Sequence, residues 1–294
     1  SPDLVPDPPT SEDNIVVFTD GKEGNPCATC EMKPYIDPFA LRNTILRLYG
    51  PDATGQVRPG RISSFTFGQL DQYISTLPRS PTPTPGIGED VTPAAPDPME
   101  AALQGADWII FAMLDPTDDL PQSGIVRRFL AEQADVLRGP RVIVLAYDAP
   151  YYLDATEISK LSAYYVVYSR IEPFIEASVR ALFSEFVPVG APPVSVTGIN
   201  YDLLTQTSPD PDQTIPLYYY VGELPGEEQS TPGLSEEGGQ TPEPPKLEVG
   251  DELRLRTGVI VDHNGHQVPD GTPVQFIFTR SEERRVGKEC VSEC

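Results

Sequence analysis

The chain has 294 residues and carries 44 acidic against 21 basic side chains, so its formal net charge is −23. Such an acidic chain argues against binding to nucleic acid or to anionic membranes, because neither offers cations to acidic side chains. No apolar run approaches the ~20 residues that a membrane helix needs, so we expect no membrane insertion. The chain begins at Ser1 without a signal-peptide pattern, and we expect it to be a piece of a longer protein.

Five short apolar runs follow one another along the first two thirds of the chain, each followed by a polar loop and a helical segment. They span residues 14–19, 62–67, 107–114, 141–147 and 163–169. Runs that are apolar throughout are typical of strands buried on both faces of a parallel sheet. They predict an α/β fold with a doubly wound, mainly parallel five-stranded sheet between helices. By analogy with flavodoxin-like sheets, we expect the strand order 2-1-3-4-5.

Helices are predicted from capping residues and from periodic apolar positions. Asp37 as N-cap and Pro38 at the first position predict a helix start, and the helix is expected to run to Gly50. Further helices are expected over residues 68–77, 99–105, 123–138, 154–161 and 173–186. The last has one apolar stripe, formed by Ile175, Val179, Leu182, Phe183 and Phe186.

Composition divides the chain into domains and linkers. Residues 1–13 are interpreted as a connector, 14–217 as the α/β domain with a Pro-rich surface insertion at 78–98, and 218–246 as an acidic Pro/Gly linker. In residues 247–279 apolar and polar residues alternate, and Asn264-Gly265 predicts a type I′ hairpin turn, so we expect a truncated all-β segment. Residues 280–290 match one reading frame of a widely used sequencing adapter, so we leave 280–294 out of the fold.

Cys27 and Cys30 form a CxxC pattern in the loop after the first predicted strand. A redox motif needs its first Cys at a helix N-terminus, which lowers the thiol pKa, but the predicted helix begins later, near Asp37. We therefore favour a structural disulfide, which fits an oxidising compartment. A zinc site needs more ligands, and none is evident nearby; His263 and His266 flank a predicted turn without a third ligand. We predict no metal site.

Polar side chains at the ends of the predicted strands are the candidate binding residues. The carboxyl ends of parallel strands meet at one edge, where open α/β sheets place their ligand groups. Carboxylates flanked by aromatic rings suit sugar hydroxyls and glycosidic chemistry, whereas the alternative is ordinary solvated loops with turn-forming Asp residues. The candidates are Asp20, Lys22, Glu23, Asp115, Asp118, Asp119, Asp148, Tyr151 and Arg170.

Two familiar kinds of site are disfavoured. Gly21 and Gly24 complete neither GxGxxG nor a Walker loop, so nucleotide binding is weakly supported and we predict no cofactor. The α/β region contains no His, which excludes a Ser-His-Asp or Cys-His site there.

The α/β region resembles the C-terminal α/β sandwich domain of bacterial glycoside hydrolase family 3 proteins. The resemblance covers roughly residues 14–217 and rests on NIVVFTD (14–20), YIDP (35–38), ADWIIFAML (106–114), VIVLAYDAPYYL (142–153) and GINYD (198–202). Residues 247–279, with PDGTPVQF (269–276), resemble the start of a bacterial Ig-like module of the invasin type.

The resemblance implies a retaining, exo-acting hydrolase of β-glucosidase or β-N-acetylglucosaminidase type. Its nucleophile is an Asp of an N-terminal (β/α)8 barrel of ~250 residues, which this chain lacks, so no catalytic residue is carried over. The acid/base also stays unassigned. The barrel is the implied partner domain and a carbohydrate the implied ligand. The domain is expected to form one wall of the sugar site and to be inactive alone.

Two classes of function stay open. In the first, the chain is the non-barrel region of a secreted glycosidase. In the second, it is a non-catalytic carbohydrate-binding or adhesion module on the cell surface, with an Ig-like stalk. Both place the protein outside the cell or on its surface. A redox protein is a third hypothesis, tested by whether Cys27 and Cys30 cycle.

Overall fold

The computed structural model describes residues 7–25, 27–77, 97–116, 121–149, 151–221 and 253–277. Nearly all of the Pro-rich insertion, most of the expected linker, the adapter-like tail, and Asp118 and Asp119 lie outside these residues. The chain divides into two units, Ser1–Asp202 and Leu203–Cys294. The division falls earlier than the expected boundary at residue 217, because residues after Asp202 bond to later ones. For example, the Asp210 N–H donates to the Val261 carbonyl at 3.0 Å.

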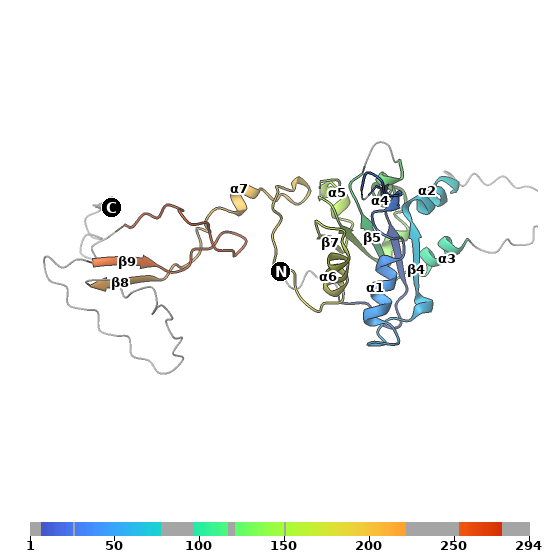
Figure 1. Ribbon diagram of the computed structural model, residues 1–294, viewed down its shortest axis with the longest axis horizontal. Coiled ribbons are helices and arrows are strands. Elements are labelled where there is room, and N and C mark those ends of the chain that lie inside the picture. Colours follow the sequence, from blue (N-terminus) through green and yellow to red (C-terminus); the bar gives the residue numbers. More distant parts are fainter. Residues whose placement is uncertain are drawn as a thin grey trace, which may run out of the picture. The chain divides into compact units, whose positions relative to one another are not determined.

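The first unit has an α/β fold built on one sheet of five strands, drawn in Figure 1. The strands are β1 (Ile15–Thr19), β4 (Ile62–Thr66), β5 (Trp108–Met113), β6 (Arg141–Ala146) and β7 (Ala163–Val166). All four pairings are parallel and the order is β4-β1-β5-β6-β7, which confirms the predicted topology. Every residue of β1 and β5 is buried, as expected for central strands covered on both faces.

Helices cover both faces of the sheet (Figure 1). Alternate residues of β1 divide between two apolar cores: Ile15 and Val17 face one, Val16 and Phe18 the other. The first core is closed by α1 (Ala40–Tyr49) and α6 (Glu172–Leu182). The second is closed by α2 (Phe67–Thr76), α3 (Pro98–Gln104), α4 (Ile125–Glu132) and α5 (Ala155–Ile158). The Pro-rich insertion was expected to span 78–98, but Asp97 and Pro98 do not belong to it, because Asp97 caps α3 and Pro98 is the first residue of that helix.

Several helix predictions are wrong in their extent. The Asp37 carboxylate accepts the Phe39 N–H at 2.8 Å, so Asp37-Pro38 forms a turn and α1 begins at Ala40. The helix expected over 123–138 is broken into a 3₁₀ turn (Pro121–Gly124), α4 and a second 3₁₀ turn (Val136–Arg138), since the chain must return to start β6. The chain turns after α6 at Ser184 (φ 59°), which leaves Phe186 44% exposed rather than on the inward stripe.

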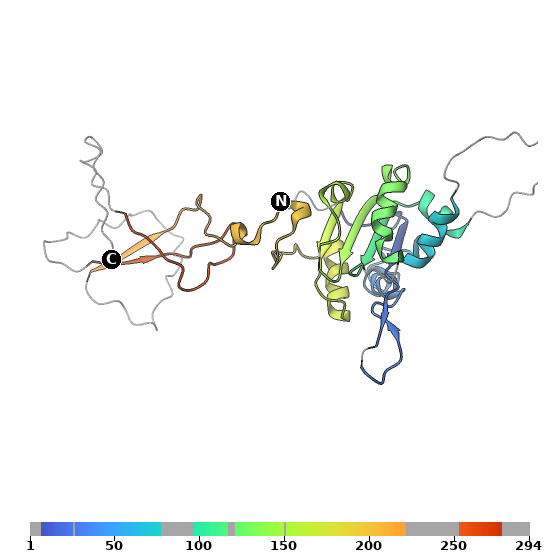
Figure 2. The ribbon, with the colours of Figure 1, turned by 90° about the horizontal axis from the view of Figure 1, so that it is seen from above.

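A two-stranded hairpin lies between β1 and α1, in place of the plain loop expected there. Strand β2 (Glu23–Gly24) pairs antiparallel with β3 (Lys33–Pro34), and Cys27 and Cys30 form a disulfide between them. Figure 2 shows this blue hairpin projecting from the sheet and its helices. Its cysteines and Met32 are exposed.

The second unit contains α7 (Leu203–Gln206) and a small antiparallel sheet of β8 (Leu217–Val221) and β9 (Leu253–Thr257). Strand β8 falls inside the segment expected to be a linker, because its backbone pairs with β9. Residues 258–277 form no strand, contrary to the alternation seen there; they make only isolated bridges, such as Val261 to Gln267. None of the helices in the described ranges has the length and apolar character to cross a bilayer.

The turn at Asn264-Gly265 is not type I′, which requires positive φ at both central residues. Gly265 has φ 80°, but Asn264 is not among the described residues with positive φ. Instead, Asp262 organises the turn, since its Oδ1 accepts the N–H groups of Asn264 and His266, both at 2.9 Å. The sequence pattern therefore predicted a turn at the correct place but with the wrong backbone conformation.

Candidate functional site at the carboxyl end of the sheet

Charged side chains from four strands gather at the carboxyl end of the sheet. Asp20 follows β1, Asp115 follows β5, Asp148 follows β6 and Arg170 follows β7. Because these strands are parallel, their carboxyl ends meet at one edge. We call Asp20, Lys22, Asp115, Asp148 and Arg170 the carboxyl-edge cluster.

Asp20 is the most buried member of the cluster, with 1% of its surface exposed. Its Oδ1 accepts the Lys22 N–H at 3.0 Å and its Oδ2 accepts the Leu114 N–H at 3.3 Å. Burial raises the pKa of the Asp20 carboxyl, and the charge of Asp148 adds to this, against the opposing effects of both N–H groups and the Lys22 charge. Asp20 therefore ties the end of β1 to the end of β5 while its ionised form is disfavoured.

Asp115 connects the cluster to the loop after β6. Its N–H donates to Asp148 Oδ2 at 3.2 Å, and its carbonyl accepts from Lys22 Nζ at 3.4 Å. The Tyr152 hydroxyl and the Ala149 N–H act to lower the pKa of its carboxyl, whereas the buried Oδ1 has no hydrogen-bond partner within the described residues. Burial raises the pKa of Asp115, followed by repulsion from Asp148. Burial and the Asp115 carboxylate in turn raise the pKa of Tyr152 to about 12.

Arg170 lies between a carboxylate and an aromatic ring. Its Nη1 is 3.6 Å from Asp148 Oδ1, and its guanidinium carbon is 3.8 Å from the centroid of the Tyr35 ring. Tyr35 stands at the base of the hairpin, where its N–H donates to the Lys22 carbonyl at 2.9 Å. A Cβ at Gly24 would collide with the Tyr35 side chain, so the glycine permits this close approach. The hairpin thus positions a ring beneath the guanidinium.

The structure brings together five of the nine candidates named from the sequence, namely the carboxyl-edge cluster. Glu23 is exposed on β2 and makes no hydrogen bond or ion pair with them within the described residues. Tyr151 is 55% exposed in the loop that carries Tyr152. The sequence reasoning missed Tyr35 and Tyr152 as site residues, although both lie in the motifs that carry the family resemblance. Tyr152 had a weak signal, as an aromatic residue in the loop after the predicted strand 141–147, whereas Tyr35 had none because it lies just before the predicted helix start at Asp37.

The cluster offers carboxylate oxygens, a lysine amine and a guanidinium stacked on a ring. Within the described ranges, no group of three or more His, Cys, Asp or Glu side chains could hold a metal ion. Carboxyls whose pKa is raised by burial and by a like charge are typical of functional sites. Cavities of about 300 and 730 Å³ are lined by other residues, so neither of them contains the cluster.

Comparisons with known proteins identify no family. No family model matches the chain, and no curated protein matches its sequence. A solved structure that matches is a fungal multi-domain GH3 β-N-acetylglucosaminidase, described as having a GCN5-related glucosamine N-acetyltransferase region. The identity is 16% and the TM-score 0.35, over 73% of this chain and 18% of that chain. A likeness this weak carries no functional conclusion, and the fold class rests on the parallel strand order of the sheet.

Proposed function

We propose that this chain is the C-terminal, non-barrel region of a family 3-like glycoside hydrolase from a bacterium, acting on terminal β-linked glucose or N-acetylglucosamine. In this proposal the carboxyl-edge cluster forms one wall of the sugar site. The nucleophile belongs to a partner (β/α)8 barrel, so the chain has no catalytic residue of its own. We also propose that the segment from residue 247 is the start of an Ig-like module.

The observation that carries the proposal is the convergence of carboxylates, Lys22 and the Arg170–Tyr35 stack at one sheet edge. Sugar hydroxyls donate to carboxylates and accept from lysine and arginine, and the apolar faces of sugar rings pack on aromatic side chains. Asp115 Oδ1 is a buried acceptor without a partner in the described chain, and such exceptions among buried polar groups occur at functional sites.

In this proposal the chain alone is inactive, because the nucleophile belongs to the barrel. Retaining hydrolysis needs two carboxyl groups ~5–5.5 Å apart across the glycosidic bond, one as nucleophile and one as acid/base. A single open wall also buries little of a ligand, so the positioning that contributes ~7–11 kcal/mol to lowering a barrier is absent. We therefore expect weak sugar binding and no turnover.

The test is release of 4-nitrophenol from β-glucoside and β-N-acetylglucosaminide substrates. The full chain should match a heat-killed control, and joining it to a family 3 barrel should give turnover. Clear turnover by the chain alone would show that the catalytic centre has been misplaced. In the protein joined to a barrel, Asp115→Ala should alter KM more than substitutions in residues 253–277 do.

The exposed Cys27–Cys30 disulfide supports a location outside the cell or on its surface, because cytosolic thiols are kept reduced. It equally fits the second hypothesis, a non-catalytic carbohydrate-binding or adhesion module. The gene sequence upstream of Ser1 separates the two. A barrel ending just before Ser1 favours the enzyme, and any other upstream domain favours the module.

A further inference from the structure

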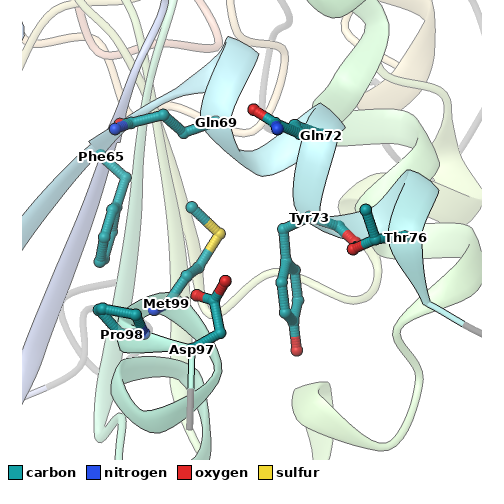
Figure 3. Close-up of a pocket in the computed structure, with 8 residues that line it drawn as sticks. All are labelled: Phe65, Gln69, Gln72, Tyr73, Thr76, Asp97, Pro98 and Met99. Atoms are coloured by element: carbon teal, nitrogen blue, oxygen red, sulfur yellow. Dashed lines mark hydrogen bonds between the residues drawn. The ribbon is translucent and has the colours of Figure 1, made fainter. Parts of the chain in front are cut away.

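A pocket of about 300 Å³ lies beside the edge strand β4, away from every residue of the carboxyl-edge cluster. It is formed by the end of β4, one side of α2 and the start of α3, and the proposed function uses none of its residues. Those that matter here are Phe65, Gln72, Tyr73, Asp97 and Met99, all drawn in Figure 3.

Two aromatic rings and a thioether form the apolar part of the pocket. Figure 3 shows the rings of Phe65 and Tyr73 on either side of the Asp97 carboxylate, with the Met99 side chain between them. Met99 is 5% exposed and belongs to the core, so it forms a fixed floor. Phe65 and Tyr73 are partly buried, and each leaves part of its ring open to the pocket.

Negative charge lies at the same place. Asp97 caps α3 by accepting the Met99 N–H at 2.8 Å through Oδ1, which leaves Oδ2 for another donor. Burial raises the pKa of the Tyr73 phenol, and the charges of Glu100 and Asp97 raise it further. No lysine or arginine is among the described residues that line the pocket. The Tyr73 hydroxyl and the Gln72 amide also lack a hydrogen-bond partner in the described part of the chain.

This combination selects for a cation. The face of an aromatic ring is negative, so a cation is attracted to it, and a carboxylate beside the rings adds to that attraction. An anion would be repelled by Asp97 and Glu100, and a neutral apolar ligand would desolvate Asp97 without replacing its water. The volume is at the lower end of ligand cavities, which suits a small head group.

We propose that this pocket binds an organic ammonium ion, with its charge beside Asp97 and its alkyl groups between Phe65 and Tyr73. The ammonium group can belong to a free small amine or to a methylated lysine side chain of a peptide. The inference rests on the pocket alone, so its failure would leave the proposed glycosidase function untouched.

The probe is choline, compared with its neutral isostere 3,3-dimethylbutan-1-ol, titrated into the full chain by NMR at constant ionic strength. We expect saturable binding of choline and binding of the isostere that is weaker by about tenfold or more. A second arm uses N-acetyl-trimethyllysine amide: tighter binding than choline assigns the site to peptides, and weaker binding assigns it to free amines. Equal binding of choline and its isostere, or no saturable binding of either ammonium probe, would overturn the proposal.

Two variants remove the charge of one carboxylate each. Asp97→Asn keeps an N-cap for α3, because Asn caps helices as well as Asp does, so the fold should be retained. Asp52→Asn makes the same change of net charge at an exposed residue outside the pocket. We expect about tenfold weaker choline binding by the first variant and unchanged binding by the second. Equal affinities of the two variants would refute the role of Asp97.

Discussion

Two groups of charged side chains in the first unit have opposite electrostatic character. One joins α1 to α6: Arg47 and Arg180 bind Glu176 at 2.7 and 2.8 Å, and the Tyr49 hydroxyl donates to Glu185 at 2.7 Å. We call it the helix-pair network. The other is the carboxyl-edge cluster, where three carboxylates share one lysine and one arginine. The first group is fully paired at the surface, whereas the second is partly paired and more buried.

The pKa directions express this difference. Hydrogen bonds from Arg47 and Arg180 lower the pKa of Glu176, and those from Tyr49 and Arg180 lower the pKa of Glu185. Burial instead raises the pKa of Asp20 and Asp115. A network that lowers carboxyl pKa values stabilises the fold at neutral pH, and a cluster that raises them opposes it. The helix-pair network therefore stabilises the fold, whereas the carboxyl-edge cluster has the raised carboxyl pKa values expected of the proposed binding wall.

The largest expected effect is on the free energy of unfolding, through the contact between α1 and α6. The Phe183 ring stacks on Tyr49 with centroids 3.8 Å apart, beneath the helix-pair network, and is 6% exposed. Phe183→Ala should lower the free energy of unfolding by about 3–5 kcal/mol, because it leaves a cavity in the core. Urea unfolding measures this. A loss below about 1 kcal/mol would show that the α1–α6 contact is not a stabilising element.

A smaller effect is expected in the cluster, on binding rather than on stability. Arg170→Lys keeps the charge but loses the planar stack on Tyr35. With a barrel supplied, KM should rise by roughly two- to fivefold, since an exposed cation–π contact contributes about 0.5–1 kcal/mol. Arg47→Lys, in the helix-pair network, is the matched control and should leave KM unchanged. Equal changes in both variants would remove the distinction between the two groups.

The sequence predicted the sheet well because its central strands are buried on both faces, which gives continuous apolar runs such as Trp108–Met113. All five residues of the carboxyl-edge cluster were among the candidates named from the sequence, since parallel strands necessarily end at one edge. The sequence did not predict the Arg170–Tyr35 stack, because that contact depends on a hairpin whose two strands, β2 and β3, have only two residues each. Such short strands have no periodic pattern to detect.

The remaining errors have local causes. The helix predicted over residues 123–138 had apolar residues at helical spacing, but the route back to Arg141 ends α4 at Glu132. At residues 262–266 a side chain, Asp262, supplies the acceptor that organises the turn, and a dipeptide signal does not encode it. In both cases the backbone conformation is decided by contacts outside the pattern that was read.

The third prediction contrasts the two groups by pH. Asp115 has a raised pKa, so the stability it contributes is fully present below its ordinary value of 3.8 and is lost as pH rises through the folded-state pKa. Glu185 has a lowered pKa, so its contribution is present above 4.5 and is lost as pH falls through the folded-state pKa. Thermal unfolding of Asp115→Asn and Glu185→Gln between pH 3 and 7 measures both.

With rising pH, Tm relative to the unsubstituted chain should increase for Asp115→Asn and decrease for Glu185→Gln. Asn at position 115 also replaces the repulsion from Asp148 by an amide that can donate to it. Parallel pH profiles for the two variants would contradict the assignment of opposite roles.

The smallest expected effect is that of the Cys27–Cys30 disulfide on global stability. The bridge lies in the exposed hairpin, whose opening does not require the two cores to open. Replacing both cysteines by Ser should therefore cost near the bottom of the ~0–5 kcal/mol range for disulfides. The hairpin base carries Tyr35, so a small rise in KM with the barrel present is expected, below that of Arg170→Lys. Thiol counting should find Cys27 and Cys30 unreactive without reductant and both reactive with it. A loss of stability comparable to that of Phe183→Ala would mean that the hairpin unfolds together with the core.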